Sequence, residues 1–369
     1  MLKRKFFLVI VISFLILLLS ACHNSSKSSV DPEYEARVIT LEGLSGGEQS
    51  ISVAQMRLLP QHDLEASYQR TTGKTERFKM QGPSLTDLIS FFGEDLANYT
   101  GVGVEGADGY YCLLSQEILE NYEPLLALAI DGKKKLSASD APARLAVQGQ
   151  FGPYWVRMVE KISFYQDVPE KNITSVWLFT NLAAGLEPYD YKYYGSTDKS
   201  YELAEIFNRL EKVDFQSFFT MKSADGFKKN EAMAMVKERY YLKTEGADSP
   251  TNVSPYIKLG MNVKNMAWFS ASNDVCIFPE QMQNYLPQNQ FQEGKGLRLL
   301  DILLETEVIA PEQKNFVLIG MGGEEVKVKG ADLIHALLVI QENGEYAVIW
   351  EDNYKMENIG NLLRIKEIS

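Results

Sequence analysis

The chain has 369 residues, of which 45% are hydrophobic and 11% aromatic, and its formal net charge at pH 7 is −12. This length and composition predict two or three compact domains with apolar cores and exclude a disordered chain. The acidic balance argues against a nucleic-acid partner, which needs a basic face. With three cysteines and three histidines, a disulfide scaffold is excluded and a His/Cys metal cage is not expected.

The N-terminal residues have the pattern of a leader peptide. A basic start at residues 3–5 precedes an almost wholly apolar run at 6–19, which is typical of a secretory signal. The small residues directly before Cys22 resemble a bacterial lipobox, so we expect residues 1–21 to be removed and Cys22 to carry lipid. The polar, Ser-rich residues 22–35 suit a flexible tether. The alternative is an uncleaved anchor, but the apolar run is short for a bilayer span. The sequence therefore predicts an extracytoplasmic protein that is lipid-anchored to the cell membrane.

The following residues predict strands alternating with short helices. Residues 36–42 alternate like a strand, 51–59 predict a strand entering a short helix, and 68–80 are polar with a central turn. A helix is expected from Ser84, where Asp87 completes a partial capping box. Further strands are expected at 102–104, 110–114, 125–130, 144–147 and 155–164.

Three segments share the order leucine, any residue, acid, apolar, apolar. They lie at 85–89, 203–207 and 299–303. A glycine-containing turn follows each at a similar distance, which predicts divergent copies of one unit. The third copy is expected to contain a helix at 332–338. The alternative is three unrelated amphipathic helices, each followed by a hairpin. The copies are expected at 36–168, at 186–285 and, shorter, at 290–369.

The first copy carries motifs that resemble those of one known family. They are Gly-Pro-Ser-Leu-Thr-Asp-Leu-Ile at 82–89, Asp-Gly-Tyr at 108–110, Leu-Leu-Ala-Leu-Ala-Ile-Asp-Gly at 125–132, the Pro- and Gly-containing segment 142–152 and Trp-Val-Arg at 155–157. Their order and spacing are similar to the oxidoreductase molybdopterin-binding domain family, which has the fold of sulfite oxidases. The resemblance implies an α+β fold, a mixed β-rich sulfite-oxidase-like module, present here in two or three divergent copies.

The sequence departs from this family at the residues that carry its chemistry. Active members hold molybdenum through a cysteine thiolate, a soft ligand that suits the metal, in a loop before the 82–89 helix. Here that loop, 70–73, has no cysteine, Cys112 lies beyond the helix, and Leu128 replaces a tyrosine of sulfite-oxidising members. We therefore expect no metal ligand and no catalytic residue. Molybdopterin is implied by the resemblance alone, and so are its contacts, namely Arg70, Thr71, Thr72, Gly73, Arg144, Tyr154, Trp155 and Arg157.

Glycines and tyrosines give two further patterns. Residues 101–106 fit the string Gly-x-Gly-x-x-Gly, but they precede a hairpin, whereas a dinucleotide site needs a following helix. The tyrosine-rich segment 189–194 is expected either to pack in a core or, with Tyr154 and Trp155, to line a groove for a flat or apolar ligand.

The histidines and cysteines have plain interpretations. His335 lies in an apolar segment and is expected in the core or at its boundary, while His62 follows a proline in a polar loop and is expected in solvent. A disulfide between Cys112 and Cys276 remains open, since the chain is expected outside the cytoplasm.

Three functions remain for a chain of this kind. The first is a membrane-anchored, non-catalytic lipoprotein whose molybdopterin-binding-like domains bind a small molecule or a protein. The alternative is a molybdopterin-dependent oxidoreductase with an atypical ligand, or an accessory subunit of one. The third is a structural subunit of a surface assembly. The sequence names no ligand.

Overall fold

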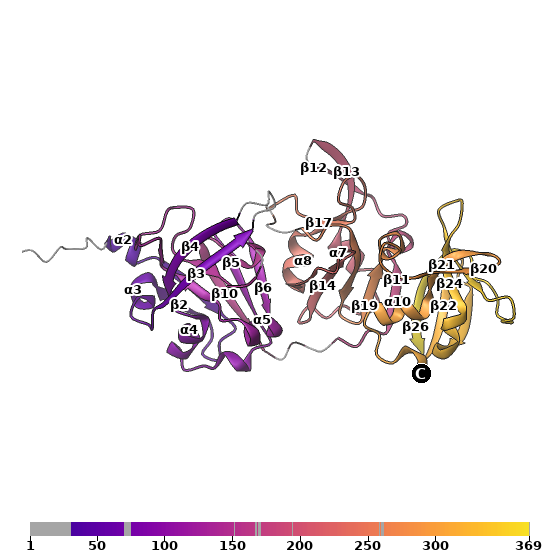
Figure 1. Cartoon of the computed structure of the whole chain (residues 1–369), viewed down its shortest axis with the longest axis horizontal. Coiled ribbons are helices and arrows are strands. Elements are labelled where there is room, and N and C mark those ends of the chain that lie inside the picture. The colour runs from indigo at the N-terminus through magenta and orange to yellow at the C-terminus, as the bar shows by residue number, and fades with distance from the viewer. Residues whose placement is uncertain are drawn as a thin grey trace, which may run out of the picture.

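The structure is a computed structural model that describes residues 31–69, 75–150, 152–166, 168, 171–193, 195–257, 259 and 262–368. Across these ranges, no helix is both long and apolar enough to cross a membrane. In Figure 1 the N-terminal part (indigo to magenta) lies beside the remainder of the chain (pink to yellow) along the long axis. The expected leader 1–21, most of the tether, Cys22, Arg70, Thr71, Thr72 and Gly73 lie outside the described residues.

The first unit, residues 31–165, contains a five-stranded sheet in the order β2-β1-β10-β5-β6. β1 pairs in parallel with β10, and the other neighbours are antiparallel. These strands are β1 (Val38–Glu42), β2 (Gln49–Ser52), β5 (Gly101–Gly106), β6 (Tyr111–Ser115) and β10 (Val159–Tyr165). Beside them lie a sheet of β3 (His62–Gln69), β4 (Thr75–Gly82) and β8 (Ala129–Ile130), and the pair β7 (Leu125–Ala127) and β9 (Arg144–Ala146).

The helix expected from Ser84 is present as α4 (Leu85–Phe91). The Ser84 side chain accepts the Asp87 N–H at 3.0 Å, and the Asp87 carboxylate accepts the Ser84 N–H at 3.1 Å. This reciprocal pair is a full capping box, which stabilises the helix start. The apolar stripe faces the core, since Leu85, Leu88 and Ile89 are buried. The other short helices of the first unit are α2 (Pro32–Glu35), α3 (Val53–Met56), η1 (Leu96–Asn98), α5 (Gln116–Asn121) and η2 (Gly152–Tyr154).

The rest of the chain is built on one eight-stranded sheet in the order β15-β14-β18-β19-β11-β26-β22-β23. The second stretch, residues 175–271, supplies β11 (Ser175–Leu178), β14 (Phe218–Ser223), β15 (Lys228–Ala232) and β18 (Met266–Ala271). The third stretch, residues 274–368, supplies β19 (Asp274–Ile277), β22 (Asn315–Gly320), β23 (Glu325–Lys329) and β26 (Leu362–Ile368). β11 and β19 pair in parallel, while β19 also pairs with β18 and β11 with β26. The first strand of each stretch therefore lies beside the last strand of the other.

The two faces of this sheet carry separate apolar cores. α7 (Leu203–Phe207) and α8 (Met233–Arg239) pack in the core that contains Phe219, and α10 (Leu299–Glu305) packs in the core that contains Phe316. Each stretch adds a four-stranded sheet, formed by β12 (Tyr189–Tyr193), β13 (Ser196–Glu202), β16 (Tyr241–Lys243) and β17 (Thr251–Val253) in one and by β20 (Gln288–Phe291), β21 (Gly294–Arg298), β24 (Ala336–Ile340) and β25 (Tyr346–Trp350) in the other. The remaining short helices are α6 (Phe179–Leu182), α9 (Pro279–Met282), η3 (Pro311–Gln313) and η4 (Gly330–His335).

The same backbone geometry occurs before the last strand of all three parts. Met158, Asn265 and Asn361 directly precede β10, β18 and β26, with φ of 50°, 47° and 52°. Their carbonyl oxygens accept N–H groups of the neighbouring hairpin turns, each at 2.9 Å. A positive φ is uncommon outside glycine, although asparagine adopts it more readily than most residues. The donors are the backbone N–H groups of Ala107, Ala224 and Met321.

Two of the expected element boundaries are wrong. The helix expected at 332–338 is instead η4 followed by β24, which lies between β21 and β25. Its buried apolar run suits a helix or a central strand equally, so periodicity could not separate them. The strand expected at 155–164 begins only at Val159, because the turn at Met158 comes first.

The minor sequence candidates fall in ordinary structural places. Cys112 and Cys276 are both free and buried, in β6 and β19, so the disulfide that the sequence left open is not formed. His335 lies at the boundary of the core, where its ring stacks on Tyr354 at 4.5 Å and its Nδ1 is 2.7 Å from Glu351.

The glycine string and His62 also have structural roles. Gly101–Gly106 forms strand β5 and continues through a turn into β6. It therefore lacks the strand-to-helix setting of a dinucleotide loop, as expected. The His62 ring is about half exposed and its Nε2 lies 2.7 Å from Asp87 at the start of α4.

Candidate functional site

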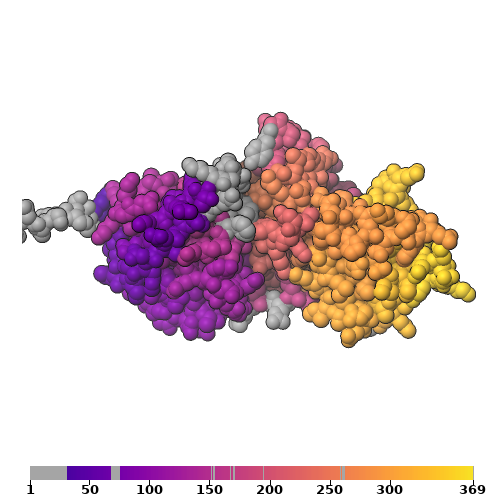
Figure 2. Space-filling model, viewed as in Figure 1, coloured from indigo at the N-terminus to yellow at the C-terminus, as the bar shows by residue number. Residues whose placement is uncertain are grey.

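The first unit meets the second stretch where strand β6 faces strand β15. Tyr111 and Leu113 of β6 are buried against Ala232 of β15, with Tyr165 and Phe218 packed beside them. The contact is thus a small apolar cluster, of the kind that excludes water at the centre of an interface. Figure 2 shows the two parts as adjoining lobes of the molecular surface.

An ion pair and a close backbone approach accompany this cluster. Arg239 of α8 donates to Glu105 of β5 at 2.8 Å, and both side chains are mostly buried. A Cβ at Gly101 would lie 2.7 Å from the Phe218 ring. Since real Cβ contacts are longer than this, glycine at position 101 lets the two parts approach closely.

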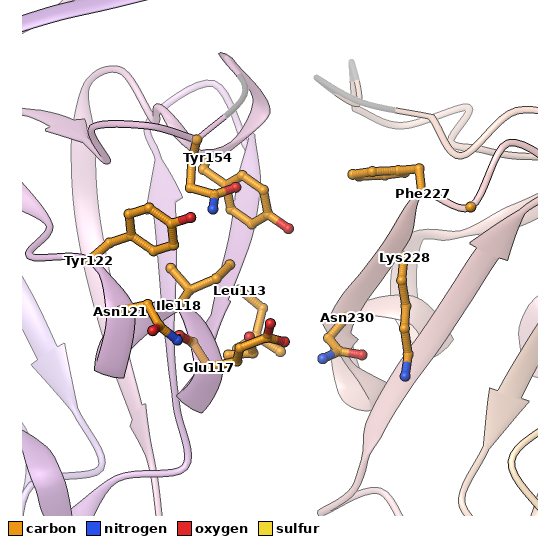
Figure 3. Close-up of a pocket in the computed structure, with 12 residues that line it drawn as sticks. Leu113, Glu117, Ile118, Asn121, Tyr122, Tyr154, Phe227, Lys228 and Asn230 are labelled. Carbon is orange, nitrogen blue, oxygen red and sulfur yellow. The ribbon is translucent and has the colours of Figure 1, made fainter.

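A cleft of about 800 Å³ opens beside this contact. Figure 3 shows its two walls facing each other, with Tyr122, Tyr154 and Asn121 on one side and Phe227, Lys228 and Asn230 on the other. This volume lies within the range of small-molecule sites. The first unit lines it with Leu113, Ser115, Glu117, Ile118, Asn121, Tyr122, Gln150 and Tyr154, and the second stretch with Gly226, Phe227, Lys228 and Asn230.

Local structure fixes the aromatic side chains of the cleft. Tyr122 is the C-cap residue of α5, and its ring packs over Gly149, where a Cβ would lie only 3.1 Å away. Tyr154 ends η2 and is largely buried, and this burial raises the pKa of its hydroxyl. Phe227 follows Gly226, whose φ of 91° makes the β14–β15 turn. The hydroxyl of Tyr154 therefore stays protonated at neutral pH.

Internal hydrogen bonds orient the two asparagines of the cleft. The Asn121 side-chain amide donates to the backbone oxygen of Glu117 at 2.8 Å. Across the cleft, the Thr220 hydroxyl donates to Asn230 Oδ1 at 2.7 Å. Asn121 thus uses an amide N–H within the protein, and Asn230 uses its amide oxygen. Asn121 Oδ1 and Asn230 Nδ2 are left to bind a ligand.

Of the cofactor residues expected from the sequence, the structure describes four and places one in the cleft. Tyr154 lines the cleft, whereas Arg144, Trp155 and Arg157 are not among its lining residues. The Arg144 guanidinium is buried against the Trp155 ring, at 5.8 Å, and lies 3.5 Å from Asp140. Arg157 Nε lies 3.4 Å from the same carboxylate oxygen. The structure therefore pairs the buried Arg144 and the exposed Arg157 with Asp140, and Trp155 packs against Arg144.

The tyrosine segment lies apart from the cleft. Tyr189, Tyr191 and Tyr193 belong to the hairpin strand β12, and Tyr189 packs on Tyr241 with ring centroids 5.2 Å apart. None of the three lines the cleft with Tyr154. The shared groove that the sequence left open is therefore not formed by these residues, while Tyr194 lies outside the described residues.

The described residues do not fit a molybdenum centre. Cys112 is fully buried within the core of the first unit, and burial raises the pKa of its thiol, so the thiolate form is disfavoured. Leu128 is fully buried as well. Among the ranges that the structure covers, no three His, Cys, Asp or Glu side chains gather as metal ligands. The Arg144 guanidinium is buried and lies 4.9 Å from the Phe78 ring centroid and 5.8 Å from that of Trp155, which withholds it from a pterin phosphate.

No sequence pattern indicated Asn121, Phe227 or Asn230 as site residues. Phe227 belongs to a turn that the repeat pattern did identify, but the pattern predicted a hairpin and not a cleft wall. The site arises only when β6 and β15 face each other, and a sequence pattern within one unit does not specify that contact.

Comparisons with known proteins identify no family for this chain. No family model matches it, and no curated protein matches it. Among solved structures it is similar to the sulfane dehydrogenase SoxCD from Paracoccus pantotrophus, with 12% sequence identity, 66% of this chain and 78% of that chain covered, and a TM-score of 0.33. A likeness this distant supports no conclusion about activity.

Proposed function

We propose that this chain is a lipid-anchored, extracytoplasmic binding protein that holds a small ligand between its first unit and its second stretch. The observation that carries the proposal is the contrast within the first unit. Its basic groups Arg144 and Arg157 contact Asp140 and its thiol is buried, whereas its aromatic and amide side chains line an open cleft. Such a lining suits binding better than redox chemistry.

The lipid anchor is part of this proposal and is supported by the sequence. The basic, apolar and small-residue pattern that ends at Cys22 resembles a lipobox, and a polar tether follows. One lipid chain alone binds membranes weakly, so stable anchoring needs a second chain. Replacing Cys22 by serine should release the protein from the membrane fraction, and unchanged membrane retention of Cys22→Ser would contradict lipidation at this residue.

We also propose that the chain consists of three divergent copies of one sulfite-oxidase-like module. Each part has a strand and short helix, a hairpin, a helix, a second hairpin and a final strand, in that order. Positive φ at Met158, Asn265 and Asn361 supports the same conclusion, because the residues before three unrelated strands would not be expected to share it. The motifs at 82–89 and 108–110 support the family resemblance of the first copy.

A ligand screen with a matched pair of variants tests the binding proposal. Asn121 and Glu120 are both exposed near the end of α5, but only Asn121 lines the cleft. Asn121→Trp should therefore fill the cleft, and Glu120→Trp should leave it open. Full-length protein is screened by thermal shift against a chemically diverse library of small molecules.

The two variants give opposite expectations. Compounds that raise the melting temperature of the wild type should act equally on Glu120→Trp and lose their effect on Asn121→Trp, since a ligand stabilises only the state that binds it. The proposal fails if every stabilising compound acts equally on Asn121→Trp, or if the library contains no stabilising compound.

A further inference from the structure

We infer that the cleft is built for a neutral, hydroxyl-rich ligand, that is, a carbohydrate. This inference rests on the binding proposal above and specifies the class of ligand for the same cleft. It follows from three properties of the walls: their aromatic surfaces, the opposite hydrogen-bonding roles of two asparagines, and the near-balance of charge.

Tyr122 and Phe227, which are partly exposed, offer apolar ring surfaces of the size of a sugar ring, and the largely buried Tyr154 forms part of the wall. Tyr122 and Tyr154 come from the first unit and Phe227 from the facing turn, as Figure 3 shows. The face of an aromatic ring carries partial negative charge, and the C–H groups on one side of a sugar ring carry partial positive charge. A sugar therefore stacks on such rings while its hydroxyl groups point outward to polar partners.

The two asparagines provide a matched acceptor and donor. Asn121 has Oδ1 left for the cleft because its amide donates to Glu117, and Asn230 has Nδ2 left because its Oδ1 accepts from Thr220. A hydroxyl group both donates and accepts hydrogen bonds. Ligand hydroxyls can therefore donate to Asn121 on one wall and accept from Asn230 on the other.

A partly buried lysine helps to fix the orientation of Asn230. Lys171 Nζ donates to Thr220 Oγ1 at 2.5 Å and to Ser270 Oγ at 2.7 Å. With Thr220 Oγ1 accepting from Lys171, the Thr220 hydroxyl donates its own proton to Asn230 Oδ1 at 2.7 Å. Thr220 is thus a positioning residue that turns the Asn230 amide nitrogen towards the cleft.

The charge of the cleft argues against an anionic ligand. Among the described residues that line the cleft, Lys228 is the one cation, and its Nζ lies 2.6 Å from Glu307. Glu117 contributes a negative charge on the opposite wall, and the whole chain has a net charge of −12. A phosphate or carboxylate ligand would therefore meet no unpaired cation among the lining residues that the structure describes, whereas a neutral sugar needs none.

The test is calorimetric titration of the full-length protein with a panel of neutral oligosaccharides. The panel contains cello-, malto-, xylo-, manno- and chito-oligosaccharides, and the detergent must be free of sugar head groups. At least one member should bind the wild type and Glu120→Trp equally. Asn121→Trp should abolish that binding.

Variants on the facing wall test the hydrogen-bonding argument. Asn230→Asp keeps the acceptor for Thr220 but replaces the cleft-facing donor by a carboxylate oxygen, so the affinity should fall at least about tenfold. Thr220→Val should weaken binding several-fold by freeing the Asn230 amide to rotate, and Thr220→Ser should restore it. A purely structural role for Thr220 would instead change stability without selective loss of sugar binding.

The outcomes separate this inference from the binding proposal. Binding of charged or apolar compounds that Asn121→Trp abolishes, without binding of any oligosaccharide, would overturn the carbohydrate inference and leave the cleft as a binding site. Oligosaccharide binding that survives both Asn121→Trp and Asn230→Asp would also overturn it. If no compound of either kind depends on Asn121, both proposals are wrong.

Discussion

The indole nitrogen of Trp177 donates a 2.7 Å hydrogen bond to the carboxylate of Asp274. Trp177 lies on β11 and Asp274 on β19, the parallel strands at which the second and third stretches meet. Both side chains are buried. Burial raises the pKa of Asp274 to about 6, while the indole hydrogen bond opposes that rise.

This pKa makes the stability of the eight-stranded sheet depend on pH. The Asp274 pKa is higher in the folded state, at about 6, than its ordinary value of 3.8, so the folded state binds the proton more tightly. The Asp274 contribution is therefore fully favourable below about pH 4 and is lost as the pH rises through about 6. Asp274→Asn, which does not titrate, should remove that dependence.

Chemical denaturation of Asp274→Asn and the wild type at about pH 4 and pH 7 measures the effect. The free energy of unfolding of the variant minus that of the wild type should be larger at pH 7 than at pH 4, by up to roughly 3 kcal/mol. A pKa difference of one unit between the folded and unfolded states corresponds to about 1.4 kcal/mol. The asparagine oxygen still accepts from Trp177, so the indole bond is retained. An equal difference at the two pH values would show that Asp274 does not titrate in this range.

Met158 offers a second test, because its backbone has a positive φ of 50°. The corresponding residues before β18 and β26 are Asn265 and Asn361, and asparagine tolerates this conformation better than methionine does. Met158→Asn should therefore stabilise the first unit by about 0.5–1 kcal/mol. Native-state hydrogen exchange of β5 and β10 measures it.

The reverse change provides the control for this comparison. Asn265→Met should destabilise the second stretch by a similar amount, measured at β14 and β18. If Met158→Asn is neutral or destabilising while Asn265→Met behaves as expected, then Met158 contributes contacts that its counterparts lack, and the equivalence of the three turns would lose its support.

The contact between the first unit and the second stretch depends on Gly101. A Cβ there would overlap the Phe218 ring, which also packs edge-on against Tyr165 at 5.6 Å. Gly101→Ala should therefore weaken the contact by about 1–3 kcal/mol. Phe218→Leu, which shortens the facing side chain, should partly restore it in the double variant.

Distances between two spin labels, measured by double electron–electron resonance, report this change. Spin labels at the exposed positions Leu58 and Ile340 should show a broader distance distribution in Gly101→Ala than in the wild type, and a narrower one again when Phe218→Leu is added. A wild-type distribution in Gly101→Ala would mean that the two parts are not held together through this cluster.

Local sequence signals predicted much of the fold. The capping box at Ser84 and Asp87 located α4, and the glycine turns located the hairpins, because both are short-range effects. The helix expected at 332–338 was wrong at its C-terminal end, where β24 begins, because a buried strand and a buried helix can have the same apolar composition. The pairing of β11 with β26 and of β19 with β18, which joins the second and third stretches, could not be predicted because it depends on long-range contacts.

The site was predicted less well than the fold. Tyr154 was identified only through a family resemblance. The same resemblance selected Arg144 and Arg157, which pair with Asp140, and Trp155, which packs against Arg144, and none of these three lines the cleft. Asn121 and Asn230 could be recognised as site residues only in the structure, where β6 and β15 face each other. A pattern of polar residues in one unit does not show which of its faces another unit will cover.

The most direct test of the account is the cofactor content of the protein. The full-length chain is purified from membranes of a host that makes molybdopterin, and molybdenum and released pterin are measured, with a known molybdopterin enzyme from the same host as the loading control. We predict that the molybdenum and the pterin content are each far below one per chain. The reason is that the Cys112 thiol is buried and that Arg144 and Arg157 pair with Asp140. Molybdenum and pterin each near one per chain would contradict the account.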